Sequence, residues 1–168
     1  MAESGAVNVE RLELVEGELI EKMKNRPHAI VQHEIAKVLY GVFGLDRVAL
    51  EHTIEVADSD RRANDPVPDL VVTLREVKFY RTSPLPQDIS LLVEVSDTTL
   101  RYDRTKAALY ARAGIVEYWV ADLNAARLIV HRTPEGGRYL SVTSYTSDES
   151  VASLAAPKVS VSVGAFFE

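Results

Sequence analysis

The chain has 168 residues, of which 46% are hydrophobic and 26% are charged, values typical of a globular domain with its own core. Its formal net charge of −6 and pI near 5.3 argue against non-specific electrostatic adhesion to nucleic acid, although a cation can neutralise a local acidic pocket. There is no cysteine, which excludes disulfides and thiolate metal sites, so any metal must be held by oxygen or imidazole ligands.

The sequence favours a cytoplasmic protein without a membrane segment. No apolar run approaches the roughly 20 residues that span a bilayer, and residues 1–10, MAESGAVNVE, lack the basic and apolar parts of a secretory signal. The absence of cysteine agrees with the cytosol. Because there is neither an internal repeat nor a low-complexity segment, we expect a single domain over residues 1–168, with residues 1–10 disordered.

The first predicted elements are a hairpin and a helix. In residues 12–23, LELVEGELIEKM, a Glu-Gly pair separates two alternating runs, which predicts a short hairpin. Residues 25–44 predict a helix, since Asn25 can cap it, Pro27 suits its first turn and Gly44 can end it. The apolar stripe of this helix comprises Val31, Ile35, Val38 and Val42.

The rest of the chain predicts mainly strands. They are expected at 48–57, 69–74, 89–96, 116–123, 126–133 and 139–146, with a last short strand within 158–168. A second helix is predicted at 99–114 and ends at Gly114. The runs at 69–74 and 89–96 are continuously apolar, as in strands that are buried on both faces. The predicted fold class is α/β, a mixed sheet flanked by at least two helices.

Glu94 is the residue that fits this pattern least, because it lies in the middle of the buried strand ISLLVEVS. Side chains of a strand alternate between its two faces. One face carries Ile89, Leu91, Val93 and Val95, and the other carries Ser90, Leu92, Glu94 and Ser96. An isolated ionised carboxylate inside a sheet is costly, so Glu94 must be paired, protonated or bound to a metal.

Asp69 and Lys106 are the natural companions of Glu94. Asp69 follows Pro68 at the start of a buried strand, where it is either a turn residue or a second acid of a site. Lys106 shares a helical face with Leu109, which directs it toward the sheet. The alternatives for Lys106 are an ammonium that reaches solvent, or a structural ion pair with Asp103.

These three residues permit one particular chemistry. Two carboxylates on neighbouring strands can share a divalent cation such as Mg²⁺, which polarises a phosphodiester and activates a water. A nearby lysine can orient that water or stabilise the negative charge that develops.

Two segments resemble a known family. VPDLVV (67–72) and LLVEVSDTTLRYDRTKAALYARAGIVEYWVADL (91–123) resemble the Uma2 family (DUF820), a set of restriction-endonuclease-like proteins in the PD-(D/E)XK nuclease superfamily. The resemblance runs from residue 12 to the C-terminus and is most specific over 91–123. It implies a restriction-endonuclease-like mixed β-sheet flanked by helices, and a site for Mg²⁺ or Mn²⁺ that cleaves DNA.

The resemblance also implies roles for individual residues. Asp69 matches the superfamily's PD aspartate and Glu94 matches the acid on the following strand, so these two would bind the metal. The usual lysine lies two residues after that acid, where this sequence has Ser96. The family resembles branches whose lysine has moved to the adjacent helix, which makes Lys106 the substitute. Asp103 lies one residue closer to this lysine than in the family pattern.

The first predicted helix supplies two further candidates. Superfamily nucleases often carry an acid on this helix, and Glu34 borders its buried face. His28 lies at one end of that face. The alternatives are a solvated helix charge for Glu34 and a buried, hydrogen-bonded side chain for His28.

Two functions of different classes compete. The first is a divalent-metal-dependent endonuclease that hydrolyses DNA phosphodiesters, for which a homodimer would provide the two sites that cutting both strands needs. It predicts that Asp69 and Glu94 converge on one cation with Lys106 nearby. The second is a catalytically inactive binding or interaction module with the same fold, which the acidic pI and Ser96 favour. It predicts Lys106 in solvent, or Glu94 neutralised by an arginine. A hydrolase of another phosphate ester is a third alternative.

Overall fold

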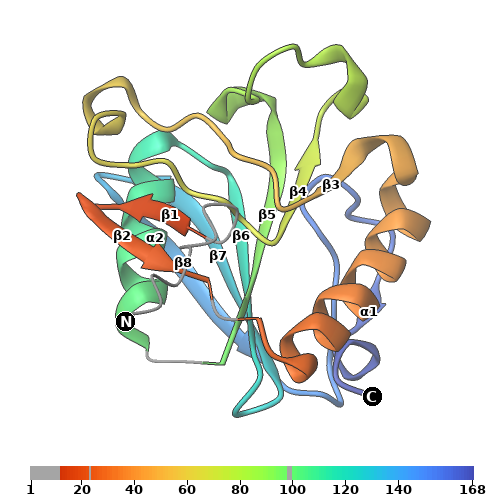
Figure 1. Cartoon of the computed structure of the whole chain (residues 1–168). Coiled ribbons are helices and arrows are strands. Elements are labelled where there is room, and N and C mark those ends of the chain that lie inside the picture. The colour runs from red at the N-terminus through yellow and green to blue at the C-terminus, as the bar shows by residue number, and fades with distance from the viewer. Residues whose placement is uncertain (1–11, 23, 98–99) are drawn as a thin grey trace, which may run out of the picture.

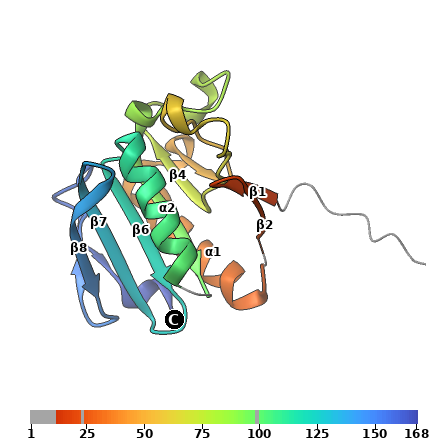
Figure 2. The same ribbon diagram turned by 90° about the vertical axis from the view of Figure 1, so that its left-hand side faces the viewer.

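The structure is a computed structural model that describes residues 12–22, 24–97 and 100–168, without the side chains of 100–103. In this part of the chain a six-stranded sheet lies between two helices (Figures 1 and 2). The elements are β1 (Leu12–Val15), β2 (Glu18–Glu21), α1 (Arg26–Phe43), β3 (Val48–Leu50), β4 (Leu70–Thr73), β5 (Ile89–Ser96), α2 (Leu100–Ala113), β6 (Glu117–Asp122), β7 (Arg127–Glu135), β8 (Arg138–Tyr145), β9 (Ser150–Val151) and β10 (Val161–Ser162). The predicted α/β class is confirmed.

The sheet is mixed because of one crossover. Its strand order is β3-β4-β5-β6-β7-β8, and β5 and β6 run parallel while the other neighbours run antiparallel. Parallel neighbours need a long connection, and α2 provides it. All residues of β4 and β5 are buried, as their continuous apolar runs predict. The predicted bounds of β5 are confirmed.

Each helix covers one face of the sheet. Val31 and Ile35 of α1 are buried against it, as predicted, but the packing continues through Leu39 and Phe43. The predicted stripe residues Val38 and Val42 are only partly buried. A row of residues four apart is inclined to the helix axis, so a helix that packs through this row shifts its contact face along its length. On the other face, α2 packs through Leu109, Tyr110 and Ala111.

The strand predicted at 48–57 is shorter than expected. It ends at Leu50 because Glu51 has a φ of 54°, a left-handed conformation that leaves the ladder. Ile54 and Val56 are buried nevertheless, in irregular backbone. The Glu51 N–H donates to the carbonyl of Asp69 at 3.0 Å, which fixes the backbone immediately before β4.

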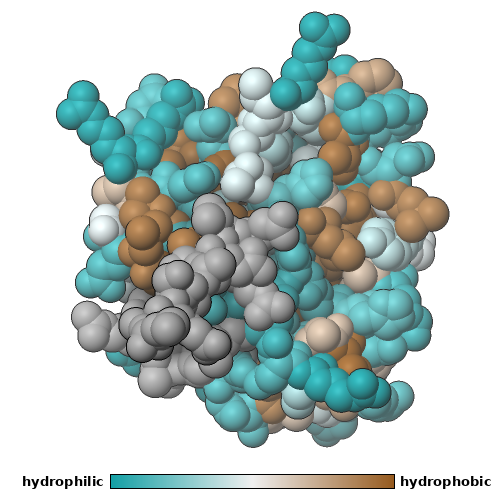
Figure 3. Space-filling model, in the orientation of Figure 1, coloured by the Kyte–Doolittle hydropathy of each residue, from teal (hydrophilic) through white to brown (hydrophobic). Residues whose placement is uncertain are grey.

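The face of the molecule in Figure 3 is largely hydrophilic where it is coloured, with hydrophobic side chains in separate groups. Within the described ranges, the helices fall short of the combined length and apolarity that a membrane crossing requires. The pairing of β9 with β10 near the C-terminus confirms the expected tail strand and adds a partner that was not predicted.

Candidate active site

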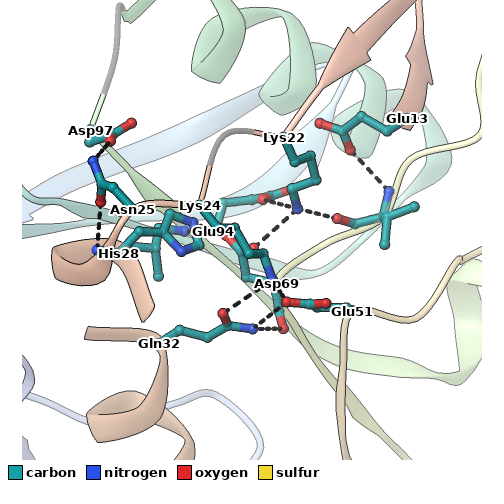
Figure 4. Close-up of polar contacts among 12 residues, drawn as sticks. Glu13, Lys22, Lys24, Asn25, His28, Gln32, Glu51, Asp69, Glu94 and Asp97 are labelled. Atoms are coloured by element: carbon teal, nitrogen blue, oxygen red, sulfur yellow. Dashed lines mark hydrogen bonds and ion pairs between the residues drawn. The ribbon is translucent and has the colours of Figure 1, made fainter. Parts of the chain in front are cut away.

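Asp69, just before the start of β4, and Glu94, on the neighbouring strand β5, approach each other (Figure 4). Asp69 directly precedes β4, and the β4 residue Leu70 pairs with Val93 of β5. Asp69 is completely buried, and its Oδ2 accepts a hydrogen bond of 2.7 Å from the backbone N–H of Val95. Glu94 is buried on the face that α2 covers. The two acids therefore belong to one site.

Lys106 projects from α2 into this site, in the direction that its helical spacing predicts. It is buried, and its Nζ donates to Glu94 Oε1 at 2.8 Å and lies 2.6 Å from Glu13 Oε1. The hydroxyl of Tyr110, one helical turn further on, donates to the same Glu94 oxygen at 3.0 Å. The alternative of a solvated Lys106 is wrong. The alternative pairing with Asp103 falls on a side chain outside the described residues.

The β1–β2 hairpin adds two charged residues that the sequence reasoning missed. Glu13 Oε2 accepts from the N–H of Val67 at 3.0 Å, and Lys22 Nζ donates to the carbonyl of the same residue. Lys22 Nζ also lies 3.1 Å from Asp69 Oδ1 and 3.6 Å from Glu94 Oε2 (Figure 4). The hairpin thus places one ammonium between the two acids.

The alternation of side chains along β1 could have predicted that Glu13 is buried. Glu13 is two residues before the buried Val15 and pairs across the hairpin with Ile20, so it belongs to the inward face of β1. A carboxylate on that face, like that of Glu94, must be paired, protonated or bound to a metal.

The remaining candidates are His28, Ser96 and Glu34, and they differ in how close they lie to the two acids. His28 is buried in the first turn of α1, with its Nε2 3.4 Å from Asp69 Oδ2. Ser96 is buried in β5, two residues beyond Glu94. Glu34 lies on a partly exposed face of α1, where its carboxylate pairs with Lys37 at 2.8 Å, so this carboxylate points to a surface partner.

Gln32 of α1, another residue that the sequence reasoning missed, supports the backbone of the site. Its Nε2 donates to the carbonyl of Asp69 at 3.1 Å and to Glu51 Oε1 at 3.3 Å. Because the carbonyl of Asp69 also accepts from the Glu51 N–H, the residue before β4 is held on both sides. This support fixes the position of the Asp69 carboxylate.

The two acids differ in their tendency to ionise. Burial alone would raise the pKa of Asp69, but the hydrogen bond from His28, the charge of Lys22 and the N–H of Val95 hold that pKa well below its usual value. Burial also acts on Glu94, and there it prevails over Lys106 and Lys22 and raises the pKa. Asp69 is therefore the stronger acid of the pair.

Both lysines of the site carry a firmly held proton. Burial on its own would lower the pKa of Lys22, but Glu94 and Asp69 outweigh it and raise this pKa. In the same way, Glu94 and Glu13 raise the pKa of Lys106 against the effect of burial. The site therefore places two ammonium groups in direct contact with buried carboxyl groups.

The donor atoms suit a hard divalent cation, but Lys22 lies where one would sit. Carboxylate oxygens of Asp69 and Glu94 face a common position, as Mg²⁺ or Mn²⁺ requires. The ammonium of Lys22 contacts both. In residues 12–22, 24–97 and 100–168 there is no group of three or more His, Asp or Glu side chains arranged to hold a metal ion. A cation that binds between the two acids must therefore displace Lys22 Nζ.

Glu117 of β6 is a further buried acid, and its partners differ from those of the site. It is the first residue of its strand, and its side chain is fully buried. Arg132, its direct neighbour on β7, donates to Glu117 Oε1 from Nε at 3.0 Å and from Nη2 at 2.7 Å. Every one of its oxygens is bonded, so this pair is structural.

The six-stranded mixed sheet between two helices is the architecture that the resemblance to restriction-endonuclease-like proteins implies. The sequence model of the Uma2 family, described as "Putative restriction endonuclease", matches residues 7–164, and the chain belongs to this family.

A solved structure is similar over nearly the whole chain. It is described as a putative nuclease belonging to DUF820 from Anabaena variabilis ATCC 29413, with a TM-score of 0.74 and 19% sequence identity, and the match covers 93% of this chain and 89% of that one. At this identity the likeness concerns the fold. A search of curated proteins found no match.

Proposed function

We propose that this protein is an endonuclease that hydrolyses DNA phosphodiesters with Mg²⁺ or Mn²⁺ held by Asp69 and Glu94. The observation that carries the proposal is the convergence of these two acids on one cationic group, the ammonium of Lys22. Membership of a family described as restriction endonucleases supports DNA as the substrate. A bound divalent cation would polarise the phosphodiester and activate a water.

The other residues of the site have separate tasks in this proposal. The N–H of Val95 and the imidazole of His28 keep Asp69 ionised and aimed at the cation. The hydroxyl of Tyr110 and the ammonium of Lys106 hold Oε1 of Glu94, which leaves Oε2 for the cation. Lys106 also places a positive charge where negative charge develops on the phosphate. Cutting both strands takes two such sites, which a homodimer would supply.

The test is the nicking of supercoiled plasmid with Mg²⁺ or Mn²⁺, and with EDTA as the metal-free control. We expect D69N, E94Q and K106M to lose about 100-fold or more of the wild-type rate. E135Q, which removes an exposed carboxylate at the end of β7, is the matched control and should cut like the wild type. An inert wild type, or the three site variants cutting at its rate, would refute the proposal.

The second candidate is an inactive module with the same fold, and one observation favours it. Lys22 neutralises the acids as a permanent counter-ion would, although the earlier expectation named an arginine. The buried Lys106 fits the nuclease candidate, which needs a cation beside Glu94. Its outcome in the plasmid assay is a wild type that does not cut at any concentration of either metal.

A further inference from the structure

We infer that Lys22 is a built-in competitor for the divalent cation, so that metal binds between Asp69 and Glu94 by displacing its ammonium. This inference rests on the proposed function, because it concerns the same two acids. Lys22 would thereby set the metal concentration at which a divalent cation occupies the site.

The contacts of Lys22 are those of a bound cation. Its Nζ lies 3.1 Å from Asp69 Oδ1 and 3.6 Å from Glu94 Oε2, and it donates to the carbonyl of Val67. Carboxylate and carbonyl oxygens are also the ligands that hard divalent cations prefer. The same oxygens therefore cannot serve the lysine and a metal at the same time.

The two lysines of the site differ in their capacity to leave it. Lys22 follows β2, which pairs with β1 and not with the six-stranded sheet, and its side chain is 13% exposed. Lys106 belongs to α2, whose neighbouring residues Leu109 and Tyr110 are fully buried in the core. Displacement of Lys22 leaves the main sheet intact, whereas displacement of Lys106 would disturb packed core residues.

The ligand set at the Lys22 ammonium favours a divalent ion over a monovalent one. Oxygens of Asp69, Glu94 and the Val67 carbonyl meet at this single position. The electrostatic attraction between oxygen ligands and a cation grows with the charge of the cation. Mg²⁺ or Mn²⁺ should therefore replace the ammonium more readily than Na⁺ or K⁺ does.

Calorimetric titration with Mn²⁺, without DNA, tests the inference on wild type, K22M and K106M. We expect K22M to bind Mn²⁺ about 10- to 100-fold more tightly than the wild type, the range of a lost charge-assisted contact. K106M removes the same charge from the cluster but not the group between the acids, so its gain should be clearly smaller. Adding D69N to K22M should abolish the gain. Equal affinities of wild type and K22M, equal gains in K22M and K106M, or no binding by any of them would overturn the inference.

A second measurement uses the wild type alone and so does not depend on the folding of a variant. Acetylation of lysines is followed by mass spectrometry with and without saturating Mn²⁺. Lys22 should react several-fold faster when the metal is bound, while Lys37, whose side chain is already 57% exposed, should not change. Lys22 that stays protected in the metal-bound protein would refute displacement.

The two proposals can fail separately. Displacement of Lys22 by Mn²⁺ in a protein that never cuts plasmid would retain the inference and remove the nuclease function. Metal-dependent cutting by a protein in which Lys22 stays protected from acetylation would retain the nuclease function and remove the inference.

Discussion

Replacing Glu117 by Gln is expected to cost about 3–5 kcal/mol of unfolding free energy, the usual cost of removing one partner from a buried ion pair. The carboxylate accepts from Arg132 Nε, Arg132 Nη2 and Trp119 Nε1 at one oxygen, and from Ser153 Oγ and the Leu154 N–H at the other. Gln has nearly the same shape, but its NH₂ group must face a donor at either position. The variant therefore loses the charge opposite Arg132 and also gains a contact between two donors.

Urea unfolding measures this cost, and a second ion pair on the same strands provides the control. Asp122 pairs with Arg127 at 3.0 Å, with side chains 16% and 37% exposed. Solvent partly screens this pair, and Asn keeps the Oδ1 that accepts from the N–H groups of Asn124 and Ala125, so D122N should lose less than about 1 kcal/mol. If E117Q unfolds within about 1 kcal/mol of the wild type, or no differently from D122N, the assignment of Glu117 as a buried structural acid is wrong.

Two further predictions concern pH and a helix end. The pKa of Asp69 in the folded state lies below its ordinary 3.8, so its stabilising contribution is present above pH 3.8 and is lost as the pH falls through the depressed value. The stability advantage of the wild type over D69N, measured by thermal melts, should therefore shrink below pH 3.8, and a constant difference would contradict the lowered pKa. Gly114 ends α2 with a φ of 79° and open space around a Cβ, so G114A should cost about 1–2 kcal/mol from backbone strain alone. G41A, within α1 and equally open, should instead stabilise by up to about 1 kcal/mol in the same urea titration, and equal effects would refute the strain at Gly114.

The sequence was most informative where one physical requirement decided the structure. β5 has apolar residues on both faces, which only a strand buried on both sides tolerates, and its bounds could be predicted. The ends of α1 could also be predicted, because Asn25 accepts from the His28 N–H as a cap and Gly44 adopts a positive φ. The strand at 48–57 was overestimated because its alternation continues past Glu51, while the left-handed backbone at that residue stops the pairing.

The site could be predicted only in part, because its members come from distant segments. The positions of Asp69, Glu94 and Lys106 followed from a strand start, a strand face and a helix face. Lys22 meets Asp69 across 47 residues, and that meeting depends on where the hairpin docks, which no local pattern encodes. Glu117 belongs to the predicted strand at 116–123, but its burial and its ion pair were not predicted. Its partner Arg132 is its direct cross-strand neighbour, and pairing the two predicted strands would have brought them together.

The self-pairing of β1 with β2 has a consequence for access to the acids. The hairpin contacts the rest of the fold through the Leu14–Asp65 bridge, through hydrogen bonds to Ala63, Asn64 and Val67, and through its ion pairs. None of these belongs to the ladder of the main sheet. The hairpin can therefore fray on its own, at a free energy below that of global unfolding. Solvent and solutes can reach Asp69 and Glu94 through such a partial opening while the rest of the domain remains native.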